Sequence, residues 1–396
     1  MSMRTRSIVL AAVLSIISTA VLAKDGDDRD ASPGTAAARA QFFGAENVNP
    51  FTGEVRQDRV IFSWATNTTY AVSVRGRVFL LDSFVTRLEQ TPGRTPFVIQ
   101  DLVNLHPEVI LLGHGHGDHA DNAAFIAGTL KIPIVSSPET CDVMQLDAGR
   151  LFGAGSTVKC IGAVSRGSTP GAEVNKLDIL RGAACVTAFK HVHSGSVAHD
   201  PSVPLVKVVN DADQRDAEMF PAGTPLFSDP KTDYRTTGFG GPAGSISLFF
   251  QFVVPGGNRF TFVWHNTTGP LKENAFGAKL FDIMDHLPKT DVELGSVVSL
   301  GFPTNGERDI VLYTQHIQPK IFVPGHVTAV AKESSSLRWK VAFEQEQNVM
   351  NVAFRPEVRW MVDPVDYLRP LVFDPNDPRW ASGDRESSNS CAGGED

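Results

Sequence analysis

A run of histidines separated by glycines is the feature of this sequence most able to do chemistry. Residues 113–119 read Gly-His-Gly-His-Gly-Asp-His and follow the apolar run Val109–Leu112. Imidazole and carboxylate groups together are good ligands for borderline divalent metals, zinc first. Gly115 and Gly117 let the backbone turn tightly enough to bring near neighbours onto a common centre. The segment therefore predicts a metal site directly after a strand.

Two sets of ligands can be separated within this segment. His114 and His116 occupy alternate positions and can face one metal, whereas Asp118 and His119 point towards a second. The sequence contains no Gly-x-Ser-x-Gly elbow, phosphate-binding loop or dinucleotide fingerprint. We therefore expect water, rather than a side chain, to be the nucleophile of any reaction.

Strands and helices alternate around the histidines in the order expected of an α/β protein. β-rich runs separated by turn residues predict an antiparallel start to a sheet at 60–64, 70–74 and 78–82. Helical spacing at 96–105 precedes the strand that leads into the histidines. A helix at 121–130, a strand at 132–136 and a helix at 138–148 follow that strand. Later elements are expected at 184–189, 246–254, 259–264, 292–300 and 321–323 as strands, and at 333–349 as a helix.

The motif His-x-His-x-Asp-His after a strand is the signature of the metallo-β-lactamase fold, and the chain resembles that superfamily over about residues 60–330. Asn67–Tyr70 followed by Leu80–Asp82 is similar to the family's first hairpin. Pro288–Val292 followed by Pro319–His326 is similar to its closing strands and its last metal histidine. The resemblance implies a four-layer αβ/βα sandwich with a metal site at one edge.

The resemblance further implies a histidine ligand just after a central strand. The run Val186–Lys190 leads into His191-Val192-His193-Ser194. The spacing is similar to the branch that contains N-acyl-phosphatidylethanolamine phospholipase D and ascorbate-6-phosphate lactonase, which selects His193. His191 has the same strand parity, so it could replace His193 or orient a ligand from behind.

The sequence departs from the family pattern at Asn266. The family places an Asp at this point, where the carboxylate bridges two metals. A neutral amide can donate one carbonyl oxygen to a metal, but it bridges two cations poorly and brings no charge. The second metal must then rely on Asp118, His119 and His326 alone, unless the neighbouring His265 compensates.

The resemblance implies hydrolysis by metal-activated water. His114, His116 and His193 would hold a first zinc ion. The resemblance leaves open whether a second zinc ion binds. Asp118 would orient the water or shuttle its proton. The bond could be an ester, lactone, amide or phosphodiester in a small-molecule substrate. Two alternatives stay open, namely a mononuclear or dinuclear iron redox enzyme on the same fold and a non-catalytic metal-binding protein.

Composition excludes several other classes of protein. The 396 residues are 42% hydrophobic and 20% charged, as in a globular protein rather than a disordered or coiled-coil one. The formal net charge is −8, from 36 Lys and Arg against 44 Asp and Glu, so no basic excess exists for a nucleic-acid backbone. Residues 56–350 are expected to form the metallo-β-lactamase-fold domain, with a cap-like insertion at 197–243. The sequence does not indicate an oligomeric state.

Both ends of the chain are expected to lie outside this domain. Arg4 and Arg6 precede a short apolar run that ends at Ala23, the plan of a cleaved signal peptide over residues 1–23. Its removal takes away two positive charges, changes the formal charge from −8 to −10, and leaves a periplasmic or secreted protein with no stable membrane insertion. The remaining segments are predicted to be a flexible leader at 24–55, a C-terminal extension at 351–380 and a disordered tail at 381–396.

Three of the four cysteines, Cys141, Cys160 and Cys185, lie in the body of the chain. In an exported protein one disulfide among them is expected, and Cys141–Cys160 closes the shortest loop. The alternative is that all three are small buried apolar residues. They form no Cys-x-x-Cys zinc pattern.

Overall fold

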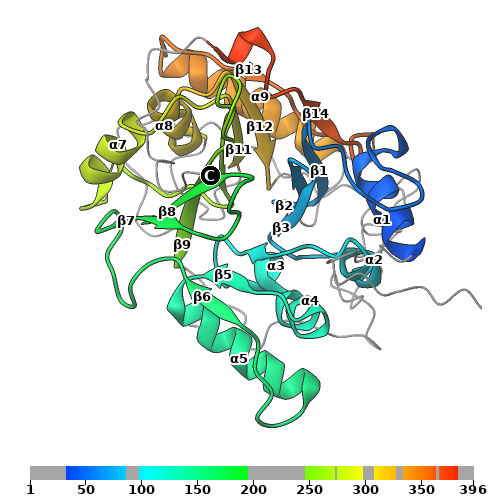
Figure 1. Cartoon of the computed structure of the whole chain (residues 1–396). Helices are drawn as coiled ribbons and strands as arrows, with labels where there is room; N and C mark the ends of the chain where they lie inside the picture. The colour runs from blue at the N-terminus through cyan, green and yellow to red at the C-terminus, as the bar shows by residue number, and fades with distance from the viewer. Residues whose placement is uncertain are drawn as a thin grey trace, which may run out of the picture. The chain divides into compact units, whose positions relative to one another are not determined.

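The computed structural model describes residues 33–85, 98–194, 246–272, 274–297, 307–326, 333–362 and 365–381. Within this part of the chain, two seven-stranded mixed sheets pack against each other and carry helices on their outer faces (Figure 1). This is the four-layer αβ/βα sandwich that the resemblance implied. The predicted signal peptide, the insertion at 197–243 and the tail from residue 382 lie outside the described residues.

The first sheet changes from antiparallel to parallel pairing along its width. Its order is β14-β1-β2-β3-β4-β5-β6, with antiparallel pairs as far as β3 and parallel pairs beyond it. The strands are β1 (Val60–Thr66), β2 (Thr69–Val74), β3 (Arg77–Leu81), β4 (Ile110–Leu111), β5 (Ile134–Ser136), β6 (Cys160–Gly162) and β14 (Leu371–Phe373).

The second sheet repeats this plan. Its order is β13-β12-β11-β10-β9-β8-β7, with antiparallel pairs from β7 to β10 and parallel pairs from β10 to β13. The strands are β7 (Val174–Leu177), β8 (Cys185–His191), β9 (Ser247–Val253), β10 (Thr261–His265), β11 (Val292–Ser296), β12 (Ile321–Gly325) and β13 (Glu357–Val358). The predicted hairpin is β9 and β10.

Aromatic side chains fill the space between the sheets. Phe62 meets Phe262 edge to face with ring centroids 4.9 Å apart, and Phe79 stacks on Phe252 at 5.7 Å. Neighbouring strand residues point the other way, so Val263 packs into a separate apolar cluster with the helices behind the second sheet. Burial on both faces explains why the central strands read as continuous apolar runs.

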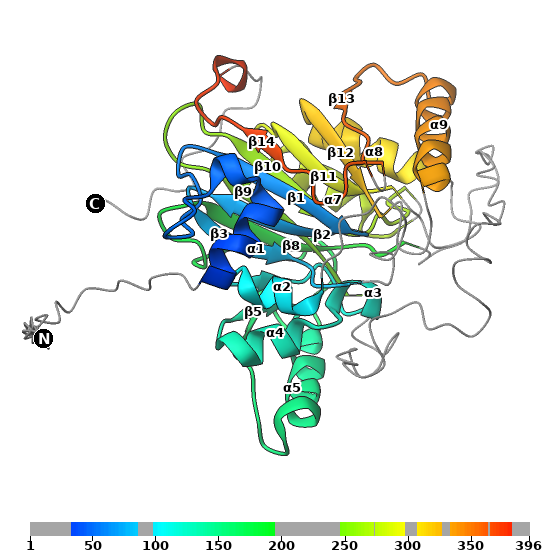
Figure 2. The same cartoon turned by 90° about the vertical axis from the view of Figure 1, so that its right-hand side faces the viewer.

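Helices cover the outer faces of both sheets (Figures 1 and 2). The β5–β6 end of the first sheet is covered by α4 (Ala123–Leu130) and α5 (Pro138–Phe152), whereas α1 (Pro33–Phe43) contacts β1 and α2 (Ile99–Asn104). Beside the second sheet lie α7 (Gly277–Asp285), α8 (Arg308–Ile317) and α9 (Glu333–Val349). In the described part of the chain, no helix is both long enough and apolar enough to cross a membrane.

Two terminal segments differ from the sequence-based expectation. Residues 33–55, predicted as part of a flexible leader, form α1, the short helix η1 (Ala45–Asn47) and a bridge between Val48 and Val55. Phe42 and Phe43 are fully buried, so α1 is anchored in the core. The predicted C-terminal extension contributes β13 and β14 to the two sheets, and η4 (Pro378–Trp380) buries Trp380. Both segments therefore belong to the domain.

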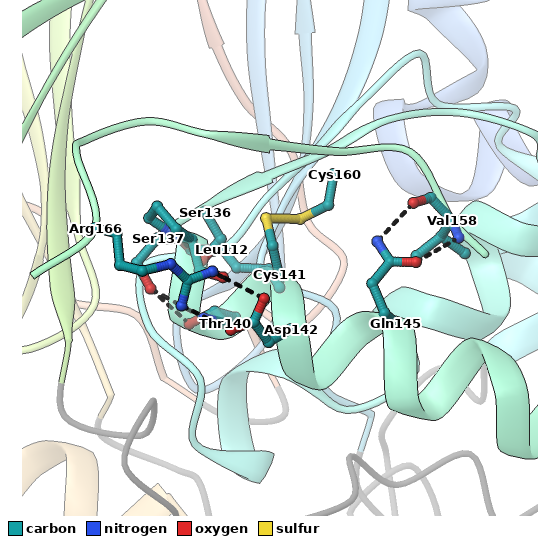
Figure 3. Close-up of a disulfide and its surroundings, with 11 residues drawn as sticks. Leu112, Ser136, Ser137, Thr140, Cys141, Asp142, Gln145, Val158, Cys160 and Arg166 are labelled. Carbon is teal, nitrogen blue, oxygen red and sulfur yellow. Dashed lines mark hydrogen bonds and ion pairs between the residues drawn. A yellow bond between two sulfur atoms is a disulfide. The ribbon is translucent and has the colours of Figure 1, made fainter.

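A disulfide joins α5 to β6, as the shortest-loop argument predicted. Cys141 and Cys160 are bonded, and Figure 3 shows two polar links beside them. The Arg166 guanidinium pairs with Asp142 at 2.7 Å, and the Gln145 amide exchanges hydrogen bonds with the backbone of Val158. The second alternative, that these cysteines are simply buried apolar residues, does not hold for this pair.

Candidate metal centre

The predicted metal ligands follow the carboxyl ends of strands from both sheets. β4 leads into His114, and the short helix α3 (Gly117–Ala120) carries Asp118 and His119. From the second sheet, His193 lies two residues beyond β8 and His326 directly follows β12. Loops at the carboxyl ends of strands are where α/β folds place their chemistry. Here residues up to 212 positions apart converge on one centre.

Three ring nitrogens form the first group of ligands, called here the first triad: His114, His116 and His193. The Nε2 atom of His114 lies 3.0 Å from Nδ1 of His116 and 3.3 Å from Nε2 of His193. The other nitrogen of two of these rings is already committed. His114 donates its Nδ1–H to the Asn266 carbonyl oxygen at 2.8 Å, and His193 donates its Nδ1–H to the backbone oxygen of Ser194 at 2.7 Å. Their Nε2 atoms therefore face each other as lone pairs.

The surroundings of the first triad disfavour protons. Burial, together with the neighbouring histidines, lowers the pKa of His114 well below its ordinary value and that of His193 to about 4. Burial also lowers the pKa of His116, although Asp118 opposes this effect. Three converging acceptors that do not take up a proton at neutral pH are chemically suited to a cation, and the donor set fits zinc.

A second group, called here the second triad, consists of Asp118, His119 and His326. Its facing atoms are the Oδ2 atom of Asp118 and the Nε2 atoms of the two histidines. Asp118 Oδ2 lies 3.4 Å from His119 and 3.3 Å from His326, and the two Nε2 atoms are 3.1 Å apart. The ligand atoms of Asp118 and His119 also lie within 4.8 Å of that of His114, so the two triads adjoin.

The second triad attracts positive charge. Burial works against ionisation of Asp118, but His119 and His326 outweigh it and hold the pKa of this carboxyl well below its usual range. Burial likewise disfavours a charged His119, yet Asp118 and Asp82 raise the pKa of its ring to about 10. Carboxylate charge therefore stabilises either a proton or a metal cation at this position.

The carboxylate of Asp82, directly after β3, supports both triads through hydrogen bonds to ligands or to residues that hold them. Its Oδ2 atom accepts hydrogen bonds from Nδ1 of His119 and from Thr68 Oγ1, each at 2.8 Å. The Asn266 amide donates to both oxygens of Asp82, at 3.2 and 3.0 Å, and the backbone N–H of Gly113 donates to Oδ1 at 3.1 Å. Asp82 is fully buried. Hydrogen bonds of this kind fix the tautomer and orientation of ligating histidines.

The two remaining candidate histidines lie in a separate buried network. His191 ends β8 and its Nδ1 atom lies 2.9 Å from the Tyr313 hydroxyl of α8. His265 ends β10 and its Nε2 atom lies 2.8 Å from Oε1 of Glu293 on β11. The structure therefore places His193, and not His191, with the ring nitrogens of His114 and His116, and it places His265 behind the centre.

The structure brings together the six residues that the sequence predicts as metal ligands. The supporting roles of Asp82, Thr68 and Asn67 are not predicted by the sequence, which places Asp82 only at the end of a strand. The Asn67 amide donates to the backbone oxygen and to Oδ2 of Asp118, at 2.8 and 3.2 Å. These contacts span 51 residues, so no local pattern signals them.

The half-buried members of the two triads are His116, Asp118 and His193, whereas the other three are buried. Among the described residues of the two triads, these three are therefore the ligands that are partly accessible to solvent. Asp118 is the carboxylate among the three.

No family model matches the chain, and no curated protein matches it in sequence. Solved structures are similar to it at low identity. Igni18, a metallo hydrolase from the hyperthermophilic archaeon Ignicoccus hospitalis, is 13% identical over 80% of this chain and 98% of its own, with a TM-score of 0.46. Zn(2+)-bound PqqB from Methylobacterium extorquens is 13% identical over 84% and 90%, with a TM-score of 0.41. CmlA, a diiron β-hydroxylase from Streptomyces venezuelae, is 10% identical over 81% and 55%, with a TM-score of 0.42.

Proposed function

We propose that this protein is an exported zinc-dependent hydrolase that uses metal-activated water on an ester, lactone, amide or phosphodiester bond. The observation that carries the proposal is the convergence of three imidazole nitrogens in the first triad, with His114 Nε2 at 3.0 Å from Nδ1 of His116 and 3.3 Å from Nε2 of His193. Three histidines with a free coordination position are a common zinc arrangement in hydrolytic enzymes.

The residues divide the work of such a reaction between them. His114, His116 and His193 would hold the catalytic ion, and His119 and His326 would hold a second ion with Asp118. Held by these residues, zinc would supply a nucleophile at neutral pH by lowering the pKa of a bound water molecule from 15.7 to about 7. Asp118 stays ionised and half-buried, so its carboxylate can accept a hydrogen bond from the attacking water and orient it. The Asn67 amide holds that carboxylate in place.

Export is supported by the disulfide and by the basic, apolar and small-residue pattern of the first 23 residues. Structural disulfides such as Cys141–Cys160 persist in oxidising compartments and are rare in the cytosol. We therefore propose a periplasmic or secreted location. The similarity in spacing to the phospholipase and lactonase branch favours lactone, ester or phosphodiester substrates over β-lactams.

An iron-dependent redox enzyme is the second candidate, and one specific observation favours it. The second triad consists of two histidines and one carboxylate, Asp118, His119 and His326, which is the ligand set of many non-haem iron(II) oxygenases. The first triad contains histidines alone and suits zinc better. The identity of the metal in protein from its native host decides between the two candidates.

The test combines metal content with turnover. The mature chain from residue 24 is purified from the native host, its metals are measured by plasma mass spectrometry, and hydrolysis is assayed with lactone, ester and phosphodiester series. Zinc together with turnover that His116→Ala abolishes supports the proposal. Iron as the resident metal, or turnover that survives His116→Ala, overturns it. The matched control is His286→Ala, because His286 is an exposed histidine at the end of α7.

A further inference from the structure

The side chain of Asn266 is committed at both ends of its amide. This fully buried residue directly follows β10. Its carbonyl oxygen accepts the Nδ1–H of His114 at 2.8 Å, and its nitrogen donates to both oxygens of Asp82. The oxygen thus lies on the Nδ1 side of the imidazole, whereas Nε2 of the same ring faces His116 and His193. The amide supports the ligand from behind rather than joining the ligand atoms.

We propose that Asn266 is a positioning residue that connects Asp82 to His114 and takes no part in coordination, and that the centre therefore binds one metal ion tightly at the first triad and a second ion much more weakly. This inference rests on the proposed metal centre but not on its reaction. It assigns to Asn266 a role different from that of a substitute bridging ligand.

The hydrogen-bonding groups around residue 266 match an amide rather than a carboxylate. A carboxylate there would lie about 3 Å from the oxygens of Asp82, and two carboxylates at that distance cannot both be ionised. Asp82 cannot turn away, because Thr68, Gly113 and His119 also donate hydrogen bonds to it. Only a residue that donates to Asp82 and accepts from His114 satisfies both neighbours.

Gly113 keeps the amide in this position. A Cβ atom added at Gly113 would lie 2.2 Å from Cγ of Asn266 and 2.3 Å from its amide nitrogen and oxygen. The amide therefore packs directly against the backbone that carries His114. A side chain at residue 113 would force it out of this position, so Gly113 and Asn266 act as a matched pair.

The two triads consequently differ in how well they are supported. In the first, Asn266 fixes the tautomer of His114 and the Ser194 carbonyl fixes that of His193. In the second, Asp82 fixes the tautomer of His119 and Asn67 holds Asp118, but Nδ1 of His326 is buried without a hydrogen-bond partner among the described residues. Ligands whose orientation is fixed in advance bind metals more tightly than ligands that must be ordered.

The first experiment measures metal binding without any substrate. The metal-free mature chain is titrated with zinc by calorimetry, and the ions retained after desalting are counted by plasma mass spectrometry. Wild type is expected to retain one zinc per chain. Asn266→Ala is expected to weaken the first site about 10- to 100-fold, the usual effect of losing such a support. Asn266→Asp keeps an acceptor for His114 but loses the amide donor to Asp82, so it is expected to recover only part of that loss.

A matched control separates positioning from folding. Asn47 is also a buried asparagine, and its amide donates to the backbone oxygen of Phe43. Both residues lie far from the triad residues in the sequence. Asn47→Ala is expected to leave zinc affinity unchanged. In the cobalt-substituted protein, Asn266→Ala is expected to shift the visible absorption bands of the bound ion, and Asn47→Ala is not. Equal spectra and equal affinities for Asn266→Ala and wild type would refute the positioning role.

The second experiment exchanges the two partners. Asp82→Asn combined with Asn266→Asp preserves an amide–carboxylate pair but moves the charge to residue 266, on the Nδ1 side of His114. Because residue 266 does not join the ligand atoms, the double variant is expected to retain one zinc ion per chain, and retention of two would overturn the positioning role. Wild type that already retains two ions of similar affinity would overturn the inference. Metal binding as expected with no turnover on any substrate would instead overturn the proposed hydrolase and leave the role of Asn266 standing.

Discussion

The Nε2 atoms of His193 and His114 lie 3.3 Å apart, although 79 positions separate the two residues in the chain. Neither ring offers a proton to the other, because each donates its Nδ1–H elsewhere. Two lone pairs at this distance repel each other unless a cation lies between them. Since burial lowers the pKa of both rings, a metal ion would suit this position better than a proton at neutral pH.

His193 and His191 should differ sharply on substitution. His193→Ala removes a ligand atom and is expected to weaken zinc binding by more than about 100-fold, beyond the usual effect of a supporting residue. His191→Ala removes the contact with Tyr313 and is expected to lower thermal stability while zinc binding is kept. Calorimetry and thermal unfolding of both variants check this expectation. Loss of zinc from His191→Ala alone would reverse the assignment.

The buried pair of His265 and Glu293 is expected to stabilise the fold behind the centre. Both residues are fully buried and their contact is 2.8 Å. Glu293→Ala leaves Nε2 of the buried histidine without this partner and is expected to cost about 1–3 kcal/mol in the free energy of unfolding. In the exposed pair of Arg359 and Glu357, Glu357→Ala should cost less than about 1 kcal/mol. Urea titrations of the two variants give the comparison, and equal losses would contradict it.

Glu346 on α9 predicts a dependence of stability on pH. Burial raises the pKa of this carboxyl to about 7, although Arg308 opposes the effect and Asp309 adds to it. Burial also raises the pKa of the facing Glu307, and Glu346 adds to that shift. Neither carboxyl has a hydrogen-bond partner among the described residues. Both carboxyls are therefore most compatible with the fold when protonated.

The sign of the effect follows from the raised pKa. The protonated Glu346 contributes fully below the unfolded pKa of 4.5, and this contribution is lost as pH rises through about 7. The loss amounts to about 3 kcal/mol at most. Glu346→Gln should therefore gain stability relative to wild type between pH 5 and pH 8, as measured by urea unfolding at several pH values. Glu344→Gln, at an exposed position on the same helix, should show no such gain.

The disulfide between Cys141 and Cys160 should stabilise the end of the first sheet. It closes a loop with a sequence separation of 19 residues, and the chain-entropy relation gives about 3 kcal/mol for a loop of that size. Replacing both cysteines by serine is expected to lower the free energy of unfolding by about this amount. Zinc stoichiometry should not change, because neither cysteine belongs to a triad. A thermal melt of the double variant that overlays the wild-type curve would refute the prediction.

The strands and the histidine segment could be predicted because their signals are local. Alternation and apolar runs mark β1, β2, β3 and the β9–β10 hairpin, and the His-x-His-x-Asp-His spacing marks four ligands at once. The helix α1 also had a local signal, since Pro33 opens an alanine-rich run and Phe42 and Phe43 close it. Its charged and glycine-containing flanks favoured the interpretation as a leader.

The role of Asn266 could not be predicted from its neighbours in the sequence. Its partners lie 184 residues away at Asp82 and 152 residues away at His114. The family pattern indicated only that an expected charge was missing. The spacing resemblance selected His193, whereas strand parity alone did not separate it from His191, because the difference arises where β8 ends, at His191. Beyond that point the chain is free to carry His193 to the other sheet.

Each triad takes two ligands from the first sheet's connections and one from the second's: His114 and His116 with His193, and Asp118 and His119 with His326. Neither sheet alone supplies all three ligands of a triad. A bound ion would therefore link the two sheets, so that ion binding and the packing of the sheets against each other stabilise one another. Ion at 100 times its dissociation constant adds about 2.7 kcal/mol to the stability of the docked state. The same metal–ligand bonds would therefore contribute both to the stability of the fold and to its chemistry.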